Sequence, residues 1–131
     1  MKKTLVFLGI LILALSLTSC LGPKKVNATI KINWSDNENY TDNSTYYLAY
    51  ANGTYSYKTI PKEGVVNITI ITPQESEYSF EVSVPADDSV TVFVYQDKDG
   101  DEKYSDDDQL FGSPVLINIY GEATGEISVY Y

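Results

Sequence analysis

The chain has 131 residues, with 9 Lys, no Arg, no His and 18 Asp and Glu, which gives a formal net charge of −9. A chain this acidic lacks the basic patches that bind a phosphate backbone, so nucleic acid is excluded as a partner. Because His is absent and Cys occurs once, the usual general base of nucleophilic enzymes and the usual ligands of soft metals are missing. Binding of hard cations by carboxylates remains accessible.

Residues 1–19 have the pattern of an export signal. Two lysines precede an apolar run from Leu5 to Leu15, which is too short for a comfortable membrane span. The tetrad Leu17-Thr18-Ser19-Cys20 then resembles the lipobox of prokaryotic lipoproteins. This resemblance implies that residues 1–19 are cleaved and that Cys20, the only cysteine, carries a lipid. The alternative is an ordinary secretory signal followed by an unrelated cysteine.

The same resemblance implies a location outside the cytoplasm, on the cell membrane or the outer membrane. Residues 20–25 would form a short tether, and the mature chain would carry a net charge of 7 − 18 = −11. Lys24 and Lys25 are placed to contact anionic lipids close to this anchor.

From residue 26 onward, polar and apolar residues alternate with a period of two, and Val, Ile, Thr and Tyr are frequent. This pattern is typical of half-buried strands, and no window has helical periodicity. We predict one domain over residues 26–131, with strands at 27–34, 45–51, 54–60, 64–71, 77–84, 90–96, 114–120 and 126–131. The large side chains expected in the core are Trp34, Ile70, Phe80 and Phe93.

Asn52-Gly53 predicts a tight hairpin between the second and third of these strands, because Asn-Gly suits a type I′ turn. In that hairpin Tyr50 opposes Tyr55, and one face gathers four aromatic side chains: Tyr46, Tyr50, Tyr55 and Tyr57. Such a face either covers the core or forms a recognition surface that stacks on sugar rings or binds a protein partner. The alternative function is therefore a carbohydrate-binding module.

Seven or eight short strands in about 105 residues indicate an all-β fold, a single immunoglobulin-like or prealbumin-like antiparallel β-sandwich. Residues 78–96 form two apolar strands that lead into an acidic loop. This segment resembles bacterial surface modules with prealbumin-like or B-repeat-like sandwiches. The resemblance implies a calcium loop between two consecutive strands.

Residues 97–108 match a twelve-residue calcium loop in one register. Carboxylates fall at positions one, three, five and twelve, a backbone carbonyl at seven and a water-holding hydroxyl at nine: Asp97, Asp99, Asp101, Asp108, Lys103 and Ser105. Two positions depart from the pattern, since Glu102 replaces Gly at position six and position twelve is Asp rather than Glu. The loop carries seven carboxylates and two lysines, so a bound calcium would relieve its self-repulsion. A solvated acidic loop is the alternative.

Catalysis would have to rest on paired carboxylates, and Glu75, Glu77 and Glu81 read instead as an outward polar face. We therefore expect a non-catalytic structural or interaction module of the cell envelope, stabilised by calcium, with a cell-surface protein or a glycan as its partner.

Asn-x-Ser/Thr triplets, which either follow from Thr-rich strands or mark surface glycosylation, begin at Asn27, Asn33, Asn39, Asn43, Asn52 and Asn67.

Overall fold

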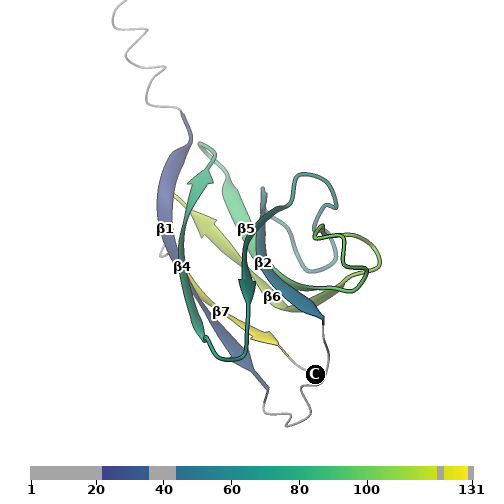
Figure 1. The fold of residues 1–131 in the computed structure, drawn as a ribbon. Coiled ribbons are helices and arrows are strands. Elements are labelled where there is room, and N and C mark those ends of the chain that lie inside the picture. Colours follow the sequence, from purple (N-terminus) through teal and green to yellow (C-terminus); the bar gives the residue numbers. More distant parts are fainter. Residues whose placement is uncertain (1–21, 36–43, 121–122, 130–131) are drawn as a thin grey trace, which may run out of the picture.

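The computed structural model describes residues 22–35, 44–120 and 123–129. The predicted leader and the lipidation residue Cys20 lie outside these ranges. Seven strands make up the described fold (Figure 1): β1 (Lys24–Trp34), β2 (Thr45–Asn52), β3 (Val66–Ile71), β4 (Glu77–Val84), β5 (Ser89–Asp97), β6 (Gln109–Asn118) and β7 (Thr124–Val129). No helix in the described part of the chain is long and apolar enough to cross a membrane.

The strands form two facing sheets, which confirms the all-β sandwich (Figure 1). One sheet has the order β4-β1-β7 and the other β3-β2-β5-β6. Every pair is antiparallel except β1 with β7, which is parallel. Immunoglobulin constant domains instead pair the first strand with the second and place the third beside the sixth. The observed strand order therefore differs from that of an immunoglobulin constant domain.

The core between the sheets follows from alternation along the strands. In β1, Ala28, Ile30 and Ile32 are buried, whereas Asn27 and Lys31 are exposed. Inward-facing residues of the other six strands complete one apolar cluster with these side chains. The outer face of the β4-β1-β7 sheet is polar as a result.

The outer face of the other sheet carries a second apolar cluster. It contains Tyr47, Ala49 and Ala51 of β2, Phe93 and Tyr95 of β5, and Ile60 and Tyr104 from two loops. These loops, residues 53–65 and 97–108, lie beside the sheet in Figure 1. All nine residues of β5 are buried, because this central strand is covered on both faces.

The predicted strand at 54–60 and its Asn52-Gly53 hairpin are wrong. Residues 54–65 contain no strand, and the neighbours of β2 are β3 and β5. A type I′ turn requires a positive φ at both central residues. Gly53 has a φ of 114°, but the φ of Asn52 is not positive. The N–H of Gly53 donates to the carbonyl of Ser89 (2.8 Å), and the Thr91 hydroxyl donates to the carbonyl of Gly53 (2.7 Å). The chain leaving β2 is thus held by β5.

The prediction that Ile70 lies in the core is wrong, because this residue is 53% exposed on edge strand β3. Trp34 and Phe80 are partly buried against the central core. Phe93 is buried, but in the outer cluster. Period-two alternation identifies buried strand residues without telling which of two apolar faces they occupy.

A glycine in β6 closes one side of the sandwich. Gly112 has a φ of 64°, and a Cβ built on it would lie 2.7 Å from the carbonyl oxygen of Ser128 in β7. Only Gly fits this backbone conformation at this separation. Gly112 therefore brings the edge strands of the two sheets into contact.

Candidate metal centre

The acidic loop connects β5 to β6, and its first carboxylate belongs to the central strand. Asp97 is the last residue of β5 and is 5% exposed. Asp108 immediately precedes β6 and is half-buried, and Asp99 is exposed. Two consecutive antiparallel strands thus fix both ends of the loop close together.

Three carboxylates converge. One oxygen from each of Asp97, Asp99 and Asp108 lies within 4.8 Å of the other two. Calcium binds oxygen at about 2.3–2.6 Å, so this span allows all three groups to contact one ion. The cluster can hold a metal ion, and its all-oxygen donors fit a hard divalent cation.

The two buried or half-buried members of the cluster are also fixed by the backbone. Asp97 accepts hydrogen bonds from the N–H groups of Gly100 (2.7 Å) and Glu102 (3.0 Å). Asp108 accepts from the N–H groups of Lys98 (2.9 Å) and Ser105 (2.7 Å). The loop is therefore wrapped around these two carboxylates.

The other predicted ligand residues lie outside this cluster. Asp101 is not among the clustered carboxylates, and its side chain accepts the N–H of Lys103 (2.8 Å). Asp99 accepts the N–H of Asp101 (3.1 Å). The hydroxyl of Ser105 accepts the N–H of Asp107 (3.2 Å). The structure thus brings together three of the six predicted ligand residues, and Lys103 and Ser105 contribute backbone donors.

The backbone at position six has the conformation expected of a calcium loop. Glu102 has a φ of 63°, in the left-handed region where a residue with a Cβ is strained. Its carbonyl accepts a hydrogen bond from the side chain of Asn67 on β3 (2.8 Å). Glu102 is thus left-handed at the position where the calcium-loop pattern has Gly.

The charge of the loop acts on its own carboxylates. The N–H of Asp101 has the largest single influence on Asp99 and lowers its pKa. Desolvation and the nearby carboxylates of Asp101, Asp108 and Asp97 together outweigh it, so the pKa of Asp99 is raised overall. Neutralisation of the Asp99 carboxylate, by a proton or by a bound cation, is therefore favoured.

Aromatic residues anchor the loop to the sheet. Tyr104 is buried, and its ring centroid lies 5.3 Å from that of Phe93 and 5.3 Å from that of Tyr95. The hydroxyl of Tyr95 donates to the side-chain oxygen of Asn67 (2.9 Å), and the Asn67 amide donates to Glu102. Burial raises the pKa of Tyr95, the hydrogen bond to Asn67 lowers it, and the charges of Asp97 and Asp108 raise it again, so that it stands at about 12.

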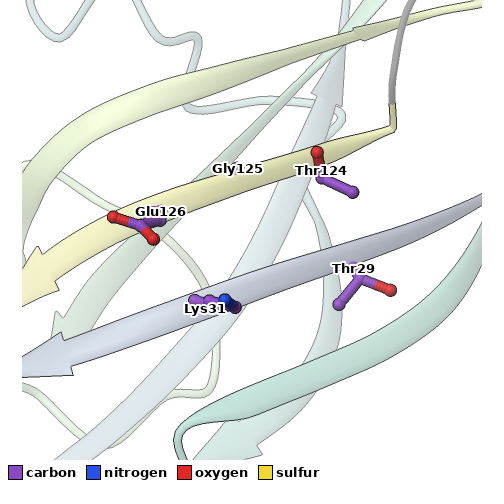
Figure 2. A pocket seen from close by; sticks show the side chains of 5 residues that line it. All are labelled: Thr29, Lys31, Thr124, Gly125 and Glu126. Atoms are coloured by element: carbon purple, nitrogen blue, oxygen red, sulfur yellow. The ribbon is translucent and has the colours of Figure 1, made fainter.

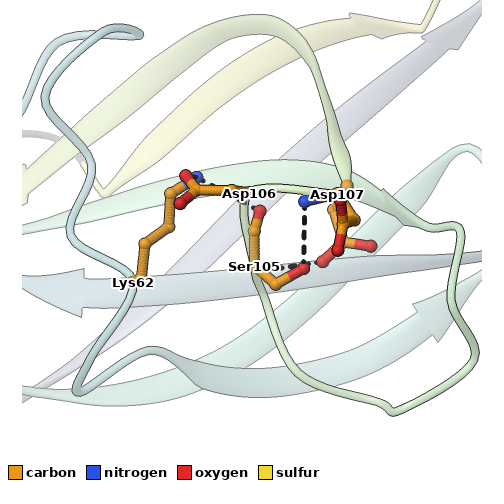
Figure 3. Close-up of polar contacts among 5 residues, drawn as sticks. Lys62, Ser105, Asp106 and Asp107 are labelled. Carbon is orange, nitrogen blue, oxygen red and sulfur yellow. Dashed lines mark hydrogen bonds and ion pairs between the residues drawn. The ribbon is translucent and has the colours of Figure 1, made fainter.

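Lys62 joins the other covering loop to the acidic loop (Figure 3). Its Nζ donates to the carbonyl of Ser105 (3.2 Å), lies 3.3 Å from a carboxylate oxygen of Asp106, and sits 4.0 Å from the ring centroid of Tyr104. Desolvation lowers the pKa of Lys62, but the contacts with Tyr104 and Asp106 raise it by more. Neither Lys62 nor Asn67 is identified by sequence spacing, since both reach the loop from distant segments.

The four tyrosines of the predicted recognition surface do not share a face. Tyr46 is 2% exposed in the central core, and Tyr50 packs against the same core. Tyr55 packs against the outer cluster instead, and Tyr57 is half exposed in the loop after β2. The expected common aromatic face depended on the hairpin that the fold lacks.

A hollow of about 270 Å³ lies on the outer face between β1 and β7 (Figure 2). Lys31 and Glu126 are directly opposite each other there, flanked by Thr29 and Thr124. On the neighbouring β4, Glu77 and Glu81 are exposed, and Glu81 pairs with Lys25 (2.9 Å). The polar groups of this hollow are open to solvent.

The chain matches no protein-family model, no curated protein and no solved structure.

Proposed function

We propose that the protein is a non-catalytic lipoprotein of the cell envelope whose β-sandwich is stabilised by calcium at the β5–β6 loop. The convergence of Asp97, Asp99 and Asp108 carries the calcium part of this proposal. The lipobox-like tetrad ending at Cys20 carries the location.

Calcium is favoured over other cations by three features of the loop. Its donors are oxygens, its spacing follows the twelve-residue pattern, and its sixth residue is left-handed. Magnesium demands near-ideal octahedral geometry and gives up water reluctantly, so it should bind less well. The expected dissociation constant is that of extracellular modules, about 10⁻⁴–10⁻³ M.

The role of the ion is structural in this proposal. At ten times its dissociation constant, a bound ion stabilises the folded state by about 1.4 kcal/mol. Tyr104 and Asn67 connect the loop to the sheet, so this free energy supports the outer cluster as well as the loop. The stabilised sandwich would then act as a structural or interaction module at the cell surface.

Thermal unfolding of chelator-treated protein tests the calcium site. Millimolar calcium should raise the melting temperature in a concentration-dependent way, and magnesium at equal ionic strength should raise it less. Asp99→Asn should raise the calcium concentration needed for half of this stabilisation, because one charged ligand is lost. A melting temperature that does not depend on calcium would contradict the proposal.

Asp107→Asn is the matched control, because it removes one charge from the same loop at a residue outside the cluster. General electrostatic attraction predicts equal losses in the two variants, whereas a defined site predicts a much larger loss for Asp99→Asn. Equal losses would mean that the loop attracts cations diffusely.

Cys20→Ser tests the anchor. The variant should accumulate as unprocessed precursor or appear as soluble protein, since stable attachment needs the lipid. Because β1 begins at Lys24, the tether is shortened to residues 20–23 and spans about 14 Å at most, which would hold the domain near the headgroups. Processing and membrane retention equal to those of the wild type would contradict the lipoprotein assignment.

A further inference from the structure

Ser or Thr stands two residues after asparagine in this chain far more often than composition predicts. Six of the eight asparagines begin an Asn-x-Ser/Thr triplet, and no middle residue is Pro. Ser and Thr together number 23 of 131 residues, so eight asparagines would give one or two such triplets by chance. These triplets are the acceptor pattern of N-linked glycosylation.

Strand alternation does not account for the excess. It places residues i and i+2 on one face, which explains polar pairs only where both lie in the same strand. Of the triplets in the described residues, those at Asn27 and Asn67 lie wholly within strands, whereas those at Asn33 and Asn52 run past the ends of β1 and β2. Asn39 and Asn43 lie outside the described residues.

The described triplets differ in exposure. Asn27, Asn33 and Asn52 are exposed, the first two on the polar β4-β1-β7 sheet that neither covering loop reaches. Asn67 is half-buried, and both ends of its amide are engaged, with Tyr95 and Glu102. A glycan on Asn67 would break the contact that holds the acidic loop.

We infer that Asn27, Asn33 and Asn52 are N-glycosylation sites and that Asn67 is not. A separate transferase would supply the sugar from a polyprenyl-phosphate-linked oligosaccharide. The amide nitrogen forms a bond to the anomeric carbon, the carbon–oxygen bond to phosphate breaks, and the phosphate leaves with the bonding electrons. The amide nitrogen gives up one proton, and nothing is oxidised or reduced.

This inference rests on the proposed export, because the transfer takes place outside the cytoplasm. The glycans would cover the polar sheet and the Asn52 end of β2, away from the acidic loop at the Asp97 end of the sheet. In β2, Asn52 pairs with Val90, whereas Thr45 pairs with Asp97. Glycosylation and cation binding are therefore compatible.

The test is peptide mass spectrometry on the full protein purified from membranes of its native cells. Peptides containing Asn27, Asn33 and Asn52 should carry a sugar-containing mass addition, and peptides containing Asn67 or Asn118 should have their sequence mass. Asn118 is a control because Tyr120, rather than Ser or Thr, stands two residues after it.

Variants at Asn52 and Thr54 separate this reaction from other additions. Asn52→Gln and Thr54→Ala should each remove the addition at that site, whereas Thr54→Ser should keep it. Sequence mass at all three exposed asparagines in a correctly cleaved protein overturns the inference alone. An uncleaved leader overturns both the inference and the proposed export. An addition that survives Thr54→Ala, or that maps to Asn67, also overturns it.

Discussion

Glu102→Gly should stabilise the protein, although it removes one carboxylate from the acidic loop. The φ of 63° at Glu102 carries a strain of about 1–2 kcal/mol, and glycine gives back about 0.5–1 kcal/mol through the flexibility of the unfolded chain. The backbone bonds of residue 102 to Asp97 and Asn67 do not depend on its side chain. The expected net gain in the free energy of unfolding therefore lies between about zero and 1.5 kcal/mol.

Urea unfolding in saturating calcium measures this gain, with Glu102→Gln as the matched control. Gln removes the same charge but keeps the Cβ, so the difference between the two variants isolates backbone strain. Gly100→Ala is the opposite change, because Gly100 has a φ of 77° and open space around its Cβ position. It should destabilise by about 1 kcal/mol.

Unfolding of the same variants with and without calcium shows whether the loop is left-handed before the cation binds. If the loop adopts the left-handed conformation only with the cation, a 1 kcal/mol gain appears as about fivefold tighter calcium binding. If the conformation is present in both states, the gain appears equally in chelator. Equal stability of Glu102→Gly and Glu102→Gln, with a neutral Gly100→Ala, would refute the strain argument.

Three further predictions concern packing, charge and pH. Gly112→Ala should lower the free energy of unfolding by more than about 2 kcal/mol in urea titrations, because its Cβ would meet the Ser128 carbonyl at 2.7 Å; a neutral effect would show that β6 and β7 can separate freely. Lys62→Met should destabilise by less than about 1 kcal/mol in chelator, since the pair with Asp106 is exposed, and a larger loss would assign Lys62 a greater role in holding the loop. The raised pKa of Tyr95 favours its neutral form in the folded state, so stability should be full below about pH 10 and fall as the pH rises toward 12. Tyr95→Phe should flatten this alkaline decline, as followed by unfolding at each pH, and an unchanged decline would assign it to other groups.

The sequence predicts those features that depend on neighbouring residues. Alternation finds strands β1 and β4 within a few residues of their observed bounds, because each has one buried and one polar face. Spacing finds the acidic loop, because Asp99 and Asp101 each accept the backbone N–H of the residue two positions later. These interactions are local and need no knowledge of the fold.

Features decided by competition between distant segments are not predicted. The segment 54–60 alternates as a strand would, but β3 and β5 take both pairing sides of β2. The displaced segment instead places Ile60 in the outer cluster and leads to Lys62, which reaches the acidic loop. Pairing strength across a sheet depends on which partners are present, and a single strand does not encode that choice.

The placement of Asp97 determines how far a cation at the loop can act. Asp97 ends β5, which pairs with β2 on one side and β6 on the other and is buried along its whole length. A buried carboxylate that binds two backbone N–H groups resists displacement, so an ion held by it is attached to the central strand rather than to a loose surface loop. Because β5 joins the central core to the outer cluster, displacement of Asp97 from the cation site requires loss of contacts on both faces of this sheet. The stabilisation by a bound cation should therefore extend to global unfolding and not only to local opening of residues 97–108.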